Sequence, residues 1–267
     1  MDRKLIRLKN IIQEMGSVLI AFSAGMDSTF LLRLARDVLP KDKILAVTAK
    51  GPLYPEEELA FAKKAAKKWG IRHKVIQNDI LKDKRFTANP INHCYFCKKS
   101  LFKKLKALAK KEKLNFVADA GNLSDKSDFR PGDQAKRELK IRSPLEEAGL
   151  TKEDIRRLSK KLGLETRNKP SLACLASRIP YGIAINRGLL EHIHQAEVFL
   201  RSLGFKQVRL RHYLHLCRIE VLAKDIPKLL RKGSGIAERL KKYGYQYVTV
   251  DLEGYRTGSL NELINKA

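Results

Sequence analysis

The stretch that most constrains the fold runs from residue 17 to residue 35, where an apolar segment passes through small residues into a helical pattern. Residues 17–22 are typical of a short buried strand, and residues 29–35 carry apolar side chains at helical spacing. Between them lies a loop with the spacing Ser-x-Gly-x-Asp-Ser, at residues 23–28. Such a loop favours an anion, because backbone N–H groups and the positive end of a helix converge where small side chains let a phosphate approach. No Gly-Lys-Ser/Thr follows, which excludes a Walker A loop.

Strand and helix patterns alternate through the first half of the chain. We expect helices over residues 3–15 and 55–69, and further strands over residues 43–49, 72–77 and 115–120. This alternation predicts an α/β fold with a doubly wound, mostly parallel sheet. Ligands of such sheets bind at the carboxyl ends of the strands, so we expect a site at the loop after the first strand, with Thr48 beside an adenine.

The second half of the chain predicts a smaller α+β module. A helix over residues 151–162 begins with a capping box of Thr151 and Asp154, and Gly163 and Lys169-Pro170 then interrupt the pattern. We therefore place one domain over residues 1–168 and a second over residues 169–267. In the second we expect helices over 187–202 and 224–242 and strands over 206–211, 216–221 and 245–250.

The charge of the chain favours anionic partners. Its 267 residues include 55 Lys and Arg against 29 Asp and Glu, a formal net charge of +26. Such a surface suits RNA, nucleotides or phosphorylated substrates. An ordinary lysine coat on helix faces, as in some thermophiles, explains the charge equally well. No apolar run is long enough to cross a membrane and the first residues lack a signal-peptide core, so we expect a cytoplasmic protein without a membrane partner.

Three of the four cysteines carry a possible chemical signal. Cys94 and Cys97 form a C-x-x-C at a helix start, and Cys174 lies in a later loop. In a reducing compartment thiols serve in metal sites, persulfide chemistry or nucleophilic attack rather than in disulfides. Three cysteines suit an iron–sulfur cluster with one open iron or a persulfide relay, and incidental buried thiols are the alternative. Cys217 stands in an apolar strand, where we expect core packing.

Several charged residues have both a functional and an ordinary interpretation. Arg209 and Arg211 alternate along one strand and so share a face, which suits a phosphate or carboxylate, although spacing alone favours a solvated face. Glu197 on a helix is expected to face solvent. Asp27 is expected both to bind Mg²⁺ and to cap the helix. Asp125, Asp128 and Arg130 are expected to form turns.

The loop at residues 23–28 closely resembles the SGGxDS pyrophosphate loop of the PP-loop ATP pyrophosphatases, with Ala24 in place of the second glycine. Those enzymes split ATP into AMP and pyrophosphate and adenylylate a substrate oxygen. The rest of the chain resembles one PP-loop family in particular. This family is the LarE-type ATP-dependent sulfur transferases, which act in the synthesis of the nickel-pincer nucleotide cofactor. The matching segments are residues 89–97, 129–132, 143–150, 174–182 and 251–256.

The resemblance implies an adenine nucleotide alpha hydrolase-like domain and a C-terminal catalytic module, in a homo-oligomer. It implies that ATP and Mg²⁺ activate a carboxylate of a pyridinium biscarboxylate mononucleotide, and that sulfur then displaces AMP to give a thiocarboxylate. Asp27 would hold the magnesium. The ATP-binding positions would be Ala21, Phe22, Ser23, Gly25, Asp27, Ser28, Thr48 and Gly121.

By the same resemblance, Cys174 is the sulfur-bearing cysteine. In the simplest members of the family it gives up its own sulfur. Members with the C-x-x-C are thought to hold a [4Fe–4S] cluster, here on Cys94, Cys97 and Cys174, and we favour this form. Arg209 and Arg211 would bind the substrate phosphate. Ser177, Arg178 and Glu197 map near the substrate, for binding or acid–base help.

Other functions stay open at this point. A tRNA-thiolating PP-loop enzyme suits the charge and the cysteines but not the mid-chain and terminal motifs, so nucleic acid is a less favoured partner. A non-enzymatic nucleotide- or RNA-binding protein would bind ATP without releasing pyrophosphate. An amide-forming synthetase is less favoured, since the sequence offers no ammonia-generating domain.

Overall fold

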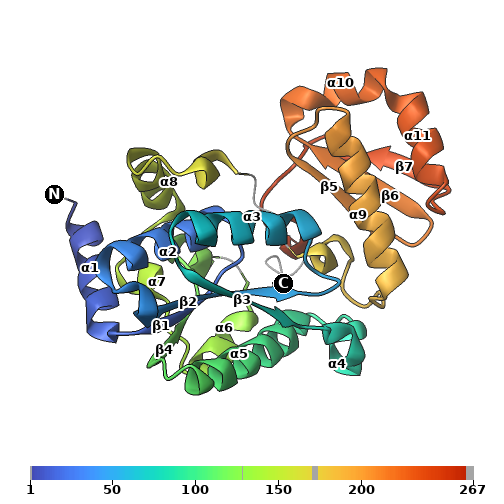
Figure 1. Ribbon diagram of the computed structural model, residues 1–267. Coiled ribbons are helices and arrows are strands. Elements are labelled where there is room, and N and C mark those ends of the chain that lie inside the picture. Colours follow the sequence, from blue (N-terminus) through green and yellow to red (C-terminus); the bar gives the residue numbers. More distant parts are fainter. Residues whose placement is uncertain (1, 128, 170–173, 263–267) are drawn as a thin grey trace. The chain divides into compact units, whose positions relative to one another are not determined.

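A computed structural model describes residues 2–127, 129–169 and 174–262 (Figure 1). By its contacts the chain forms two compact units. The first comprises Met1–Ile80 and Asn92–Leu172, and the second comprises Leu81–Ile91 and Ala173–Ala267. Within the described ranges no helix is long and apolar enough to cross a membrane.

The first unit is built on a four-stranded sheet of order β3-β2-β1-β4, in which every pair is parallel. Val18 in β1 lies opposite Ile44 in β2 and Phe116 in β4. This is the predicted parallel sheet, with β1 and β2 as its two inner strands. The strands are β1 (Val18–Ala21), β2 (Ile44–Lys50), β3 (Arg72–Gln77) and β4 (Phe116–Ala118).

Helices cover both faces of this sheet, as a doubly wound fold requires (Figure 1). Val18 and Ile20 enter one hydrophobic cluster with α1, α2 and α8, whereas Leu19 enters a second cluster with α5. The alternation follows from the two-residue period of a strand. The helices of this unit are α1 (Arg3–Met15), α2 (Met26–Val38), α3 (Glu56–Lys68), α5 (His93–Lys111), α6 (Gly132–Glu138), α7 (Pro144–Glu147) and α8 (Lys152–Lys161).

The second unit carries a three-stranded sheet of order β5-β6-β7. The strands β5 (Val208–Tyr213) and β6 (Leu216–Val221) pair antiparallel, and β7 (Tyr247–Val250) pairs parallel with β6. Helix α9 (Arg187–Ser202) packs against β5. Cys217 in β6 is fully buried, which confirms its predicted place in the core. The other helices are α4 (Lys84–Thr87), α10 (Ile226–Arg231) and α11 (Gly233–Lys241).

Short 3-10 helices join these elements. In the first unit they are η1 (Lys41–Lys43), η3 (Leu123–Ser127) and η4 (Glu165–Asn168), and η2 (Ile80–Lys82) stands where the chain passes from the first unit to the second. In the second unit they are η5 (Leu175–Arg178), η6 (Ala223–Asp225) and η7 (Ser259–Asn261).

Two details differ from expectation. The predicted helix over residues 224–242 is two helices, α10 and α11, which are separated at Lys232, directly before a glycine. Glycine loses more conformational freedom than other residues in a helix, so it favours a break there. The expected domains over 1–168 and 169–267 also differ from the two units, because residues 81–91 belong to the second unit. The Asn89 side chain holds this segment there by donating to the carbonyls of Pro180 (2.8 Å) and Ile183 (2.9 Å).

Candidate active site

The loop between β1 and α2 has the geometry of an anion site. Gly25 is the N-cap of α2, and the first intrahelical bond runs from the Thr29 N–H to the Gly25 carbonyl. The N–H groups of Met26, Asp27 and Ser28 therefore have no acceptor within the helix. Together with the positive end of the helix they can bind a phosphate. The Ser23 and Ser28 hydroxyls lie 3.1 Å apart across the same loop.

Asp27 lies beside this loop with one carboxylate oxygen engaged. That oxygen accepts the Asn122 side-chain amide at 3.1 Å. The Oδ1 atoms of Asp27 and of Asn122 are both buried and accept no hydrogen bond from the described residues. Two such oxygens suit a hard cation such as Mg²⁺. The predicted capping role of Asp27 is wrong, since the cap is Gly25 and Asp27 already stands inside the helix.

Asp125 lies between Asn122, which binds Asp27, and two basic side chains. Its Oδ2 accepts the Asn122 N–H at 3.2 Å, which is the predicted turn role, and its Oδ1 lies 2.7 Å from Arg130 Nη2 and 3.6 Å from Lys152 Nζ. Burial and the nearby charge of Asp125 raise the pKa of Asp27 to about 6. A bound cation would stabilise the ionised form of this pair. Asp128 lies outside the described residues.

Thr48 and Gly121 follow the neighbouring strands. The Thr48 hydroxyl donates to the Phe22 carbonyl at 2.8 Å, and its oxygen lies 2.8 Å from His73 Nε2. Burial lowers the pKa of His73. A Cβ added to Gly121 would lie 3.0 Å from Lys136 Nζ and 3.3 Å from Asp119 Oδ1, so a larger residue there would crowd the side chains of Lys136 and Asp119.

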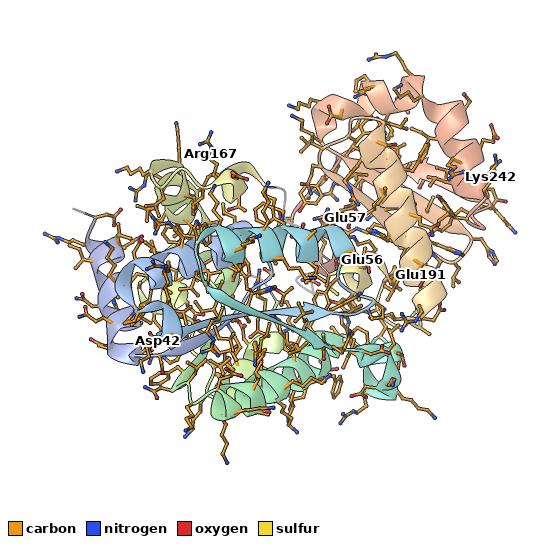
Figure 2. The ribbon with its side chains drawn as sticks, viewed as in Figure 1. Asp42, Glu56, Glu57, Arg167, Glu191 and Lys242 are labelled. Carbon is orange, nitrogen blue, oxygen red and sulfur yellow. The ribbon has the colours of Figure 1, made fainter. Side chains whose placement is uncertain are left out.

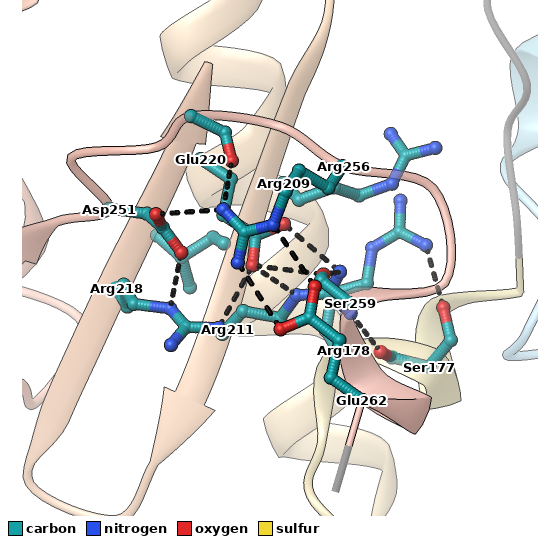
Figure 3. Close-up of polar contacts among 12 residues, drawn as sticks. Ser177, Arg178, Arg209, Arg211, Arg218, Glu220, Asp251, Arg256, Ser259 and Glu262 are labelled. Atoms are coloured by element: carbon teal, nitrogen blue, oxygen red, sulfur yellow. Dashed lines mark hydrogen bonds and ion pairs between the residues drawn. The ribbon is translucent and has the colours of Figure 1, made fainter. Parts of the chain in front are cut away.

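A buried cluster of arginines and glutamates lies in the second unit (Figure 3). Arg178 makes two bonds to Glu197, at 2.8 and 3.0 Å. Arg211 makes two bonds to Glu220, at 2.9 and 3.0 Å, and donates also to Ser259 Oγ and to the Ser177 carbonyl. We call Arg178, Glu197, Arg209, Arg211 and Glu220 the arginine cluster; each is at most 5% exposed.

The charges of the arginines and glutamates in the arginine cluster partly balance one another. Burial opposes the ionisation of Glu197, but the charges of Arg178 and Arg209 outweigh it and lower the pKa of that carboxyl. Burial and the charge of Arg178 lower the pKa of Arg209 to about 10, so its guanidinium stays protonated at neutral pH. Three cations against two carboxylates leave the arginine cluster positive, as a phosphate site requires.

Cys174 is held at the edge of this cluster. Its carbonyl accepts the Ser177 N–H (3.0 Å), the Ser177 hydroxyl (2.7 Å) and Arg178 Nη1 (3.1 Å). These contacts fix the backbone of Cys174 while its side chain stays partly exposed. In this arrangement Arg178 and Ser177 both bind the Cys174 carbonyl.

The C-x-x-C lies in the first unit. Cys94 is exposed and Cys97 half-buried in the first turn of α5, three residues apart and so on one side of the helix. All four cysteines of the chain are thiols. Neither unit, over its described residues, groups three His, Cys, Asp or Glu side chains as a metal site.

Comparison with known proteins decides the family. The chain is 35% identical over 256 residues to the pyridinium-3,5-bisthiocarboxylic acid mononucleotide synthase of Lactiplantibacillus plantarum, and the match covers 96% of this chain and 93% of the relative. The chain belongs to the LarE-type sulfur transferases.

Two further proteins are similar to the chain over nearly their whole length. An uncharacterised protein of Synechocystis is 40% identical over 268 residues, which is all of both chains. An uncharacterised protein of Methanocaldococcus jannaschii is 33% identical over 260 residues, 96% of this chain and 98% of its own. No protein-family model matches the chain. The two-part fold described above is therefore that of a LarE-type enzyme with a PP-loop domain.

Within this LarE-type chain the structure brings together two groups of predicted residues. The first unit holds the loop, Thr48 and Gly121 at the carboxyl ends of β1, β2 and β4. The second holds Cys174 and the residues about it, including Arg209 and Arg211 on one buried face of β5. The solvated-face alternative for these arginines, and the expected exposure of Glu197, are therefore wrong.

Three residues that the sequence did not single out complete the sites. Asn122 orients Asp27, Lys152 lies beside Asp125, and Glu220 fixes Arg211. The sequence offers one indication of Asn122, which directly follows Gly121 and lies shortly after β4, at the carboxyl edge of the sheet. The sequence gives no indication of Glu220, because a glutamate in a strand next to apolar residues does not reveal which partner neutralises it.

Proposed function

We propose that this protein uses ATP to adenylylate a carboxylate of a pyridinium biscarboxylate mononucleotide and then converts it into a thiocarboxylate, in the synthesis of the nickel-pincer nucleotide cofactor. The observation that carries the proposal is the 35% identity, over 96% of the chain, to a relative named for the bisthiocarboxylic product. The anion-binding helix start and the buried arginine cluster support it.

ATP would bind in the first unit. The N–H groups at the start of α2 would bind its phosphates, and Thr48 would flank the adenine. Asp27 and Asn122 would hold Mg²⁺ through their buried oxygens, which accept no bond from the described residues. A bound magnesium neutralises charge that develops on the leaving pyrophosphate.

The first step activates a poor electrophile. A carboxylate oxygen of the mononucleotide attacks the α-phosphorus of ATP, the bond to the pyrophosphate oxygen breaks, and pyrophosphate leaves. In the second step a sulfur nucleophile attacks the acyl carbon and AMP leaves with its oxygen. Arg209 and Arg211 would bind the phosphate of the mononucleotide, and Arg178 and Ser177 would hold Cys174.

Two sources of sulfur fit Cys174. Its thiolate can displace AMP to form a thioester; removal of the Cα proton of Cys174 by a base and breakage of its Cβ–S bond would then leave dehydroalanine and release the thiocarboxylate. Alternatively Cys94, Cys97 and Cys174 would hold a [4Fe–4S] cluster, which when bound supplies an open iron for an extra sulfide. Thiolates are the donor set of such clusters, and the exposure of Cys94 and the partial exposure of Cys97 and Cys174 are compatible with a cluster. We favour the cluster, in a cytoplasmic homo-oligomer.

Isotopic labelling tests the adenylylation step. The purified protein is given ATP, Mg²⁺ and mononucleotide whose carboxylates carry labelled oxygen. The proposal predicts that pyrophosphate release requires the mononucleotide and that the label appears in AMP. Pyrophosphate release that is stimulated by tRNA and not by the mononucleotide would favour the tRNA-thiolating alternative, which the charge of +26 supports.

A further inference from the structure

A lysine outside both groups of site residues described above contacts the loop of residues 23–28. Lys169 follows η4, and its side chain is only 19% exposed. Its Nζ donates to the Ala24 carbonyl at 3.0 Å and to Glu58 Oε2 at 2.7 Å. It also lies 4.3 Å from the centre of the Phe61 ring. A carbonyl, a carboxylate and an aromatic face thus surround one ammonium group within the first unit.

The contact with Ala24 determines the direction of a neighbouring amide. A peptide bond is planar and trans, so the Gly25 N–H points opposite to the Ala24 carbonyl. Lys169 holds that carbonyl on its own side of the loop. The Gly25 N–H is consequently turned away from Lys169, and it donates to no residue that the structure describes.

Ala24 makes this restraint necessary. Its φ is +59°, in the left-handed region that glycine adopts freely and alanine does not. With alanine, the left-handed conformation carries strain, and a peptide rotation at residues 24 and 25 would relieve it. The Lys169 bond opposes such a rotation, because rotation would remove the carbonyl from the ammonium.

Glu58 and Phe61 hold the lysine itself. Glu58 is 14% exposed in its side chain, so its ion pair with Lys169 is screened less than a surface pair. Both residues lie on α3, one turn apart, and fix the ammonium from one helix. Lys169 is therefore pre-placed before any ligand binds.

We propose that Lys169 is a positioning residue that fixes the Ala24–Gly25 peptide so that the Gly25 N–H faces the phosphates of ATP. The assignment of the ligand rests on the proposed function, whereas the orientation of the peptide does not. Glu58 acts through Lys169 in the same role.

The test compares Lys169→Met with Lys68→Met. Lys68 makes an exposed ion pair with Glu165 at 3.2 Å and is the matched control for loss of one lysine. Two quantities are measured: the affinity for Mg²⁺–ATP by calorimetry without a second substrate, and the amide resonance of Gly25 without any ligand. Lys169→Met should bind about tenfold more weakly or worse, since a bond to a charged group is lost. Its Gly25 resonance should shift, whereas Lys68→Met should change neither quantity.

Wild-type affinity together with an unmoved Gly25 resonance in Lys169→Met would overturn the proposal. Lys169→Arg should restore both quantities in large part, because arginine can donate to the same two oxygens. If Lys169→Met does not fold, Glu58→Gln replaces it, with smaller changes expected in the same direction and the same criterion for rejection. If the wild-type protein binds no Mg²⁺–ATP, the proposed function fails, and the Gly25 resonance alone still decides the role of Lys169.

Discussion

Arg178 and Glu197 form a buried ion pair with two parallel hydrogen bonds, and the same arginine donates to the carbonyl of Cys174. Their side chains are 1% and 2% exposed. Glu197 on α9 is thereby connected to the cysteine that is expected to carry sulfur. The pair explains why Glu197 is buried on α9 although the other buried residues of this helix are apolar.

Glu197→Ala should destabilise the second unit and loosen Cys174. It would leave Arg178 buried without its carboxylate, a loss that costs about 3–5 kcal/mol. Urea unfolding measures the stability, and the rate of alkylation of Cys174 measures its order. Glu191→Ala, at an exposed position of α9, is the control and should change neither (Figure 2). Unchanged alkylation in a destabilised Glu197→Ala protein would show that the pair does not position the cysteine.

Asp27→Asn should stabilise the ligand-free protein at high pH. The pKa of Asp27 is raised from 3.8 to about 6 by burial and by Asp125, so folding loses stability as pH rises between these values. Removal of the charge should raise the free energy of unfolding by on the order of 1–3 kcal/mol at pH about 8, and by little at pH about 4. Equal differences at both pH values would contradict the raised pKa. The same variant should lose affinity for Mg²⁺–ATP.

Arg209→Met should weaken binding of the mononucleotide and leave ATP binding unchanged. Arg209 is buried in the arginine cluster, and its guanidinium lies 5.2 Å from the Tyr255 ring. A charge-assisted bond to a phosphate is worth about a tenfold change in affinity or more. Lys206→Met, exposed just before β5, is the matched control. Calorimetry with each ligand separates the two effects, and an equal loss for ATP would argue against a separate mononucleotide site.

Replacement of single cysteines should divide them into two classes. Cys94→Ala, Cys97→Ala and Cys174→Ala should each lose iron from anaerobically purified protein. Cys217→Ala should keep it, because Cys217 is fully buried in β6 and burial raises the pKa of its thiol to about 12. Full retention of iron by Cys94→Ala would exclude the three-cysteine cluster.

The local pattern of residue types in the sequence predicted those parts of the fold that depend on residues close together in the chain. The strand, loop and helix around Gly25 and the capping box of Thr151 and Asp154 lie as expected, because each is defined within a few residues. The burial of Arg211 and Glu220 could not be predicted, since strand alternation shows that two side chains share a face but not what covers it. Contacts between residues far apart in the sequence were also missed, because local patterns do not show which distant segments meet. Lys169 meets Ala24 across 145 positions.

The most direct test of sulfur transfer is the mass of the mononucleotide product, together with that of Cys174, before and after turnover by anaerobic protein with Mg²⁺–ATP. The proposal predicts that oxygen is replaced by sulfur in the product, with one pyrophosphate released for each replacement. An unchanged Cys174 in protein that holds iron and sulfide would identify cluster-borne sulfur, and loss of H₂S from Cys174 would identify a sacrificial cysteine. A product that contains no sulfur, despite pyrophosphate release and both substrates bound, would contradict the proposed function.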